Sequence, residues 1–210
     1  MNITQITETY IKEHPSIRNC LKNNLINYSK LSRLIIKELH LEKKTTKDAL
    51  LIAARRYQTK LKKQQSNEKE IITLLKKSEI EIKTKIVVFV VEKSLYLDNL
   101  LDLEKKIKKK ADLFYAIEGT AAFTLITTEK YYDDFVQFFK HKIVNESREL
   151  VMIIIKSSKD IEETPGVVSY LLSLFAENQV NAYEIMSCWT DTIFVIHQND
   201  LEKAIGFLKF

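Results

Sequence analysis

Glycine and proline are scarce in this chain of 210 residues, which contains Gly119, Gly166, Gly206, Pro15 and Pro165. Their scarcity excludes long flexible linkers and a glycine-rich phosphate loop. No stretch approaches 18 consecutive apolar residues, so we expect no membrane-spanning helix and no membrane partner. The N-terminus lacks a basic-then-apolar signal pattern, and the two cysteines show no metal-ligand spacing. These absences predict a cytoplasmic protein with reduced thiols.

Patterns typical of catalysis are also missing. The four histidines have no metal-ligand spacing, and no G-x-S-x-G nucleophile motif occurs. Adjacent carboxylates occur at Asp133-Asp134 and Glu162-Glu163, but neighbours in sequence rarely face one site. We therefore predict a non-enzymatic protein with no catalytic residue, no metal and no cofactor.

Charge is distributed unevenly around a net value of +5. Residues 1–70 hold 15 Lys and Arg against 7 Asp and Glu, whereas residues 141–210 hold 6 against 10. A basic N-terminal region on a neutral-to-acidic body favours a polyanionic partner for that region alone. A lysine-rich proteome accounts for the same bias, and both explanations stay open.

Hydrophobic periodicity predicts an all-helical region at residues 1–64. Helices are expected over 3–13, 16–23, 28–39 and 46–63, the third of them capped by Asn27. A connecting helix is expected within residues 65–78. The remaining chain shows the order strand, helix, strand, strand, helix twice, at residues 79–148 and 149–210. This pattern predicts an α+β protein with an N-terminal all-α domain, followed by two ferredoxin-like βαββα(β) modules with two small sheets.

The second repeat contains an informative set of turn residues. Pro165-Gly166-Val167 opens a helix with an aliphatic stripe, and Val180-Asn181-Ala182 leads into the next strand. In these residues the chain resembles the ACT domain family, particularly the regulatory domains of aspartate kinases. The detailed match covers residues 150–208, whereas residues 84–140 match only in element order and have Glu92-Lys93-Ser94-Leu95 at the corresponding loop.

The resemblance implies an effector pocket, with an amino acid as the expected effector, at an interface between modules. Its residues would be Glu162, Thr164, Pro165, Gly166, Val167, Val168, Asn181, Ala182 and Tyr183. A helix N-terminus is a natural carboxylate site, and an asparagine offers both a donor and an acceptor. The alternative is that Gly166 and Asn181 only satisfy turn geometry.

Residues 28–63 can form a helix-turn-helix pair whose second helix has one apolar and one basic face. The candidate nucleic-acid contacts are Lys47, Arg55, Arg56, Lys60 and Lys63. The connection between the two helices lacks the usual glycine. A helical docking or dimerisation domain with a solvated basic face is therefore the alternative.

Two functional hypotheses follow. In the first, tandem ACT-like modules sense an amino acid and the helical domain passes the signal to DNA or a partner. In the second, the chain is an interaction module that regulates or scaffolds a metabolic enzyme without binding nucleic acid. A bare apolar sheet face usually pairs with another module or with a second subunit, and we expect a homodimer or higher homo-oligomer.

Overall fold

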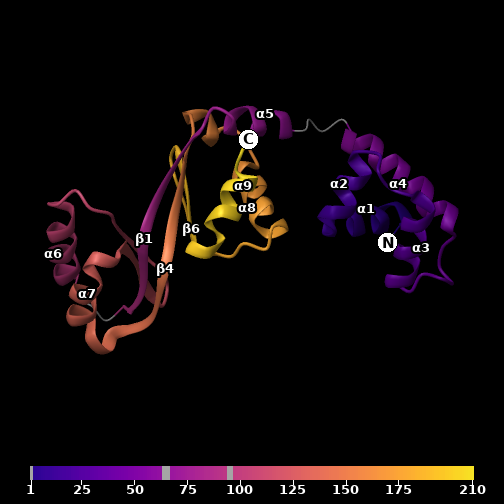
Figure 1. The fold of residues 1–210 in the computed structure, drawn as a ribbon. Coiled ribbons are helices and arrows are strands. Elements are labelled where there is room, and N and C mark those ends of the chain that lie inside the picture. Colours follow the sequence, from indigo (N-terminus) through magenta and orange to yellow (C-terminus); the bar gives the residue numbers. More distant parts are fainter. Residues whose placement is uncertain (1, 63–66, 94–96) are drawn as a thin grey trace. The chain divides into compact units, whose positions relative to one another are not determined.

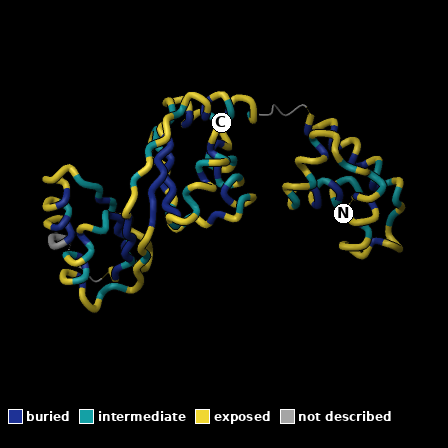
Figure 2. The backbone as a smooth tube through the Cα atoms, in the orientation of Figure 1, coloured by how far each residue is buried: buried dark blue, intermediate teal, exposed yellow. Residues whose placement is uncertain are grey.

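The computed structural model describes residues 2–62, 67–93 and 97–210, and the side chains of helix α6 from Leu100 onward. The chain forms two compact units, Met1–Ser66 and Asn67–Phe210. Each unit has a core of its own, visible as dark blue segments in Figure 2. In the part of the chain that is described, every helix is too short or too polar to cross a membrane.

The first unit is all-helical, as the periodicity predicts. It contains α1 (Ile3–Glu13), α2 (Pro15–Lys22), α3 (Tyr28–Glu38) and α4 (Lys47–Lys62). The side chain of Asn27 accepts a hydrogen bond from the Lys30 amide at 3.0 Å, which confirms the predicted cap of α3. The apolar stripe of α4 faces the other helices, and its buried members are Leu50, Ala53, Ala54, Tyr57 and Leu61.

The second unit combines helices with one sheet. Its helices are α5 (Glu68–Leu75), α6 (Leu97–Lys108), α7 (Tyr132–Phe139), α8 (Val167–Glu177) and α9 (Leu201–Phe207). Its strands are β1 (Glu79–Glu92), β2 (Phe114–Glu118), β3 (Ala122–Thr128), β4 (Ile143–Lys156), β5 (Ala182–Cys188) and β6 (Asp191–His197). The α+β class is therefore confirmed.

The prediction of two separate small sheets is wrong. All six strands form one antiparallel sheet in the order β2-β3-β1-β4-β6-β5. The two repeats are joined because β1 and β4, each 14 residues long, pair with one another from Glu79↔Lys156 to Val91↔Ile143. The sequence pattern of β4 predicts a strand only over 150–155, because the preceding residues Glu146, Ser147, Arg148 and Glu149 are polar.

In both long strands, the alternation of side chains between the two faces of the sheet is interrupted where the two halves of the sheet meet. Lys85 in β1 and Glu149 in β4 have positive φ values of 56°, and the β1–β4 register shifts there. A one-residue bulge reverses which face the following side chains occupy. On β1, Lys83 and Ile86 therefore point to the same face of the sheet, since they pair with Met152 and Leu150.

The helices cover one face of this sheet, which we call the outer face. Because the sheet curls so that its inner face packs against itself, helices on this one face appear on both sides of β1 and β4 in Figure 1, with α6 and α7 on one side and α8 and α9 on the other. Each group covers its own core: Val87, Phe89 and Val91 face α6 and α7, while Val151 and Phe194 face α5, α8 and α9.

The opposite, inner face packs against itself. One buried cluster joins Ile86, Val88 and Ile126 of the first half to Met152, Met186, Ile193 and Val195 of the second. Burial raises the pKa of the Tyr115 phenol on β2, and the nearby Cys188 on β5 raises it further. Tyr115 and Ile117 of β2 pack against the buried cluster that contains Met186 of β5, so the two end strands of the sheet approach one another. A large part of the apolar surface expected to need a partner is therefore buried within the chain.

Candidate functional site

A pocket lies where α8 begins, on the outer face of the sheet. The chain leaves β4, forms a 3-10 turn at Lys159–Glu162, and enters α8 through Thr164, Pro165 and Gly166. The Ser157 amide donates to the Thr190 carbonyl at 2.9 Å, which holds this loop against the β5–β6 hairpin. The pocket, with a volume of about 390 Å³, is lined by Ile161, Glu162, Thr164, Gly166, Val167, Val168, Ser169, Ser187 and Trp189.

Gly166 determines how α8 starts. Its φ of 96° is left-handed, a conformation that glycine adopts without the penalty of a side chain. The Gly166 carbonyl accepts the first helical hydrogen bond, from the Tyr170 amide at 2.8 Å. The amides of residues 167–169, the first turn of α8, have no partner within the helix. In the described part of the chain, no side chain caps this end of α8. The pocket therefore faces the positive end of the helix dipole.

The other lining groups complement that positive end. The carboxylate of Glu162 supplies a negative charge, and Thr164 and Ser187 supply hydroxyl groups. Trp189, the single tryptophan of the chain, is 69% exposed and adds an aromatic wall. The arrangement can bind a ligand that has both a carboxylate and a cationic group.

The structure divides the nine predicted ligand residues into two groups. Five of them line the pocket: Glu162, Thr164, Gly166, Val167 and Val168. Pro165 lies in the same loop. Asn181, Ala182 and Tyr183 lie at the opposite end of β5 from Ser187, a distance of roughly 20 Å for a strand of this length.

Four further residues line the pocket without having been predicted as ligand residues: Ile161, Ser169, Ser187 and Trp189. Ser187 and Trp189 lie more than 20 positions after the loop in sequence and reach it only through the antiparallel β4–β6–β5 order. An exposed tryptophan at a hairpin tip was the available signal. For the first repeat, the corresponding loop includes residues 94–96, which lie outside the described residues.

Helix α5 packs on the same loop from the other side. Ile71 Cδ1 lies 3.5 Å from the position that a Cβ atom would take at Gly166. A second cavity, of about 350 Å³, is lined by residues of both α5 and the loop, and Thr164 lines both cavities. Its lining residues are Lys69, Glu70, Thr73, Leu74, Lys77, Ser158, Asp160 and Thr164. Helix α5 is the first helix of the second unit, so the loop contacts the N-terminal helix of its own unit.

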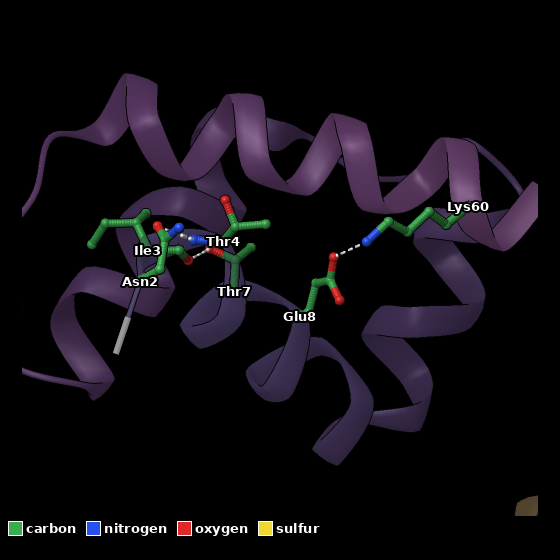
Figure 3. A network of polar contacts seen from close by, with 6 residues as sticks. All are labelled: Asn2, Ile3, Thr4, Thr7, Glu8 and Lys60. Atoms are coloured by element: carbon green, nitrogen blue, oxygen red, sulfur yellow. Dashed lines mark hydrogen bonds and ion pairs between the residues drawn. The ribbon is translucent and has the colours of Figure 1, made fainter.

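The predicted nucleic-acid residues are distributed along α4. The Arg55 guanidinium lies over the Tyr28 ring, 5.3 Å from its centroid, and burial raises the pKa of the Tyr28 phenol. Lys60 Nζ lies 2.5 Å from Glu8 Oε1, and Figure 3 shows this ion pair joining α4 to α1. Two of the predicted cations thus interact within the unit.

The other three predicted cations differ in position. Arg56 is exposed, whereas Lys47 is partly buried at the start of α4. Lys47 lies roughly 20 Å along the helix axis from Lys60. Lys63 lies outside the described residues. The described part of the chain also contains no group of three histidine, cysteine, aspartate or glutamate side chains that could hold a metal ion.

Comparisons with known proteins give structural matches only. No protein-family model matches the sequence, and no curated protein matches it. Aspartate kinase from Clostridium acetobutylicum matches with a TM-score of 0.52 and 15% identity over 62% of this chain and 33% of that one. The ligand-free regulatory subunit of aspartate kinase from Thermus thermophilus matches with a TM-score of 0.50 and 8% identity over 63% of this chain and 94% of that subunit.

The structure of aspartokinase alpha and beta subunits also matches, with a TM-score of 0.50 and 11% identity over 61% of this chain and 93% of that one. At these identities the likeness establishes the fold, which is similar to the ACT-type regulatory domains of aspartate kinases. The resemblance drawn from Pro165-Gly166-Val167 is therefore confirmed at the level of the fold. The chain spans about one third of the Clostridium enzyme.

Proposed function

We propose that this chain is a non-enzymatic regulator that binds a small metabolite, of the amino-acid class, in the pocket at the start of α8. The observation that carries this proposal is that the uncapped N-terminus of α8 and the acidic residue Glu162 line the same cavity. An α-amino acid has the matching pair, because its carboxylate suits the helix end and its ammonium suits Glu162.

The remaining lining groups support a ligand with a side chain of modest size. Ile161, Val168 and Trp189 provide apolar surface, and Ser187 provides a hydroxyl group. A cavity of about 390 Å³ is at the small end of ligand-binding cavities. The similar Clostridium protein is an allosteric enzyme of amino-acid production, which agrees with an amino-acid effector here.

We further propose that the sheet consists of two ACT-type modules, 79–148 and 149–210, preceded by a connecting helix within 65–78. The second half of β1, α6, β2, β3, α7 and the first half of β4 give the order βαββαβ. In the second module, β4, α8, β5, β6 and α9 lack a fourth strand, and Glu79–Lys83 of β1 pairs with β4 in its place. This exchange of strands supports one mechanical unit, in which ligand binding at one module stabilises both.

A homodimer explains why Asn181 lies apart from the pocket. The last strand of the sheet is β5, where Tyr183 and Ile185 are exposed apolar residues. Antiparallel pairing of β5 with a second copy would place the Asn181 end of one strand beside the Ser187 end of the other. The two groups of predicted ligand residues would then meet across the dimer interface. Size-exclusion chromatography with light scattering, on wild type and Ile185→Lys, tests this arrangement.

The proposed ligand site can be tested with a matched pair of variants. We expect at least one of the twenty amino acids to raise the melting temperature of the wild-type chain. Glu162→Gln should abolish that rise, whereas Glu163→Gln, at the neighbouring residue outside the pocket lining, should preserve it. A flat response across the panel, or equal behaviour of the two variants, contradicts the proposal.

We propose DNA as one candidate partner of the helical unit. The residues that would contact it are Lys47, Arg55, Arg56, Lys60 and Lys63. In a mobility-shift assay at low salt, Arg55→Ala/Arg56→Ala should weaken DNA binding. Lys203→Ala/Lys209→Ala removes the same charge from the second unit and serves as the control. Absence of DNA binding favours the second candidate, a module that regulates or scaffolds a metabolic enzyme. The ion pair of Lys60 with Glu8 and the stacking of Arg55 on Tyr28 favour this candidate, because both cations contribute to packing.

A further inference from the structure

The helical unit has an apolar groove that its own core leaves open. The groove lies between α2 and α3, has a volume of about 440 Å³, and is lined by Ser16, Ile17, Cys20, Leu25, Ile26, Asn27, Lys30, Leu31 and Leu34. Leu31 is buried at its floor, whereas Leu25 is 76% exposed and Leu34 39% exposed. Exposed leucines around an apolar depression leave apolar surface in contact with water, and a bound partner would cover that surface.

All the charged residues in the segment that forms this groove are cationic. Between residues 14 and 37 the chain has no aspartate or glutamate, and it contains Arg18, Lys22, Lys30, Arg33 and Lys37. Lys30 lines the groove itself, and Lys37 follows Leu34 by three residues and Lys30 by seven, on the same side of α3. The next residue, Glu38, accepts a hydrogen bond from the Tyr10 hydroxyl of α1 at 2.7 Å. The field at the groove therefore favours a negatively charged partner.

Shape and polarity decide which anionic partner fits. A concave apolar floor accepts a ridge of apolar side chains, which the phosphate backbone of a nucleic acid does not have. A membrane surface is flat and is bound by protruding rather than recessed apolar groups. The α3 part of the groove, from Asn27 to Leu34, extends about 10 Å along the helix axis, which matches two turns of a second helix.

We propose that this groove binds an acidic amphipathic helix of a partner protein. The partner presents apolar side chains at i, i+3 or i+4, and i+7 to Ile17, Leu31 and Leu34. Its aspartates and glutamates flank that stripe and lie opposite Lys30 and Lys37. None of the groove's lining residues belongs to α4 or to the α8 pocket.

An unbiased selection tests both the binding and its chemistry. A display library of helical peptides is selected on the full chain, with counter-selection against the Leu34→Glu variant. Enrichment of peptides that combine the apolar spacing with acidic flanks supports the proposal. Failure to enrich any peptide, or enrichment of peptides with basic flanks, overturns it.

Affinities of an enriched peptide, measured by fluorescence anisotropy, then locate its site. Leu34→Glu should weaken binding about tenfold or more, that is by ~1.4 kcal/mol. Leu39→Glu is the control, because Leu39 ends the same helix, is 41% exposed and is not a lining residue. Lys30→Glu should weaken binding, whereas Lys12→Glu on α1 should not. Circular dichroism confirms that the variants fold.

Alternative occupants give different results. If anionic vesicles or duplex DNA lose binding on Leu34→Glu while no peptide binds, the proposal is wrong. If Leu34→Glu changes the subunit number and leaves peptide binding unaltered, the groove is an interface between copies of this chain and the proposal is again wrong. Protection of the Cys20 thiol from a thiol-reactive dye by the peptide, measured in a Cys188→Ser background, independently supports occupancy of the groove.

Discussion

The Cδ1 atom of Ile71 lies 3.5 Å from the position that a Cβ atom would take at Gly166. This contact joins helix α5, which follows the boundary between the two units, to the residue that starts α8 and lines the proposed ligand pocket. A distance of 3.5 Å is ordinary van der Waals contact, so a methyl group at position 166 would fit there. The constraint at Gly166 is therefore its backbone conformation.

Replacement of two glycines by alanine should have opposite effects on stability. Gly166→Ala forces a side chain into a left-handed conformation and should lower the free energy of unfolding by about 1–2 kcal/mol. Gly206→Ala lies within α9, where an added Cβ meets nothing within 4 Å, and should raise it by up to about 1 kcal/mol. Urea denaturation measures both values. Equal effects of the two changes contradict the role assigned to Gly166.

Removing the Ile71 side chain should loosen the pocket loop. Ile71 is buried, and Ile71→Ala should destabilise the second unit by about 2–5 kcal/mol. We also expect it to weaken the proposed amino-acid binding, because the loop at Gly166 loses its support. The control is Leu101→Ala on α6, an exposed helical position where the change should stay within about 0.5 kcal/mol. Calorimetry of ligand binding and of unfolding distinguishes the two effects.

The inner face should make the two halves of the sheet unfold together. Ile126 on β3 belongs to the cluster shared with Met186 and Ile193 of the second half. Ile126→Ala should cost about 2–5 kcal/mol, and the fluorescence of Trp189 in the second half should report the same lowered midpoint as circular dichroism. Val144→Ala, at a residue that is 63% exposed, should leave the midpoint unchanged. A Trp189 transition insensitive to Ile126→Ala would show that the halves unfold independently.

The stability of the second unit should depend on the charge of Glu184. Burial raises the pKa of this carboxyl above its ordinary value of 4.5. A raised pKa means that the folded state binds the proton more tightly, so the folded state is favoured below pH 4.5 and this advantage is lost as pH rises through the higher folded value. Glu184→Gln should therefore raise the urea midpoint at pH 7 and have little effect at pH values below 4.5. The exposed Glu177→Gln is the control, and a pH-independent effect of Glu184→Gln contradicts the assignment.

Local signals were sufficient to predict the helices and most of the strands. The four helices of the first unit follow from apolar residues at helical spacing and from the Asn27 cap. The pocket loop was predictable because Pro165 restricts its own backbone and that of Thr164, and Gly166 tolerates the left-handed conformation, without any tertiary contact. Five of the nine predicted ligand residues consequently line one pocket.

Long-range pairing was beyond such signals. The polar residues from Glu146 to Glu149 give no alternating pattern, yet they continue β4 because β1 offers them a partner along its whole length. Ser187 and Trp189 come to the pocket because β5 is the third strand from β1 in the sheet order, and no local pattern encodes that order.

The sequence by itself determined where most helices begin and which side chains are apolar, and it places at the start of α8 a glycine, which tolerates the left-handed conformation found there. Only the tertiary structure decided that two repeats form one sheet and that their inner faces bury one another. The physical reason is that backbone preferences act within a few residues, whereas strand pairing and burial are decided by the net free energy of contacts between segments far apart in the chain. The bulges at Lys85 and Glu149 connect the two levels, because a one-residue shift there sets which face every later side chain occupies.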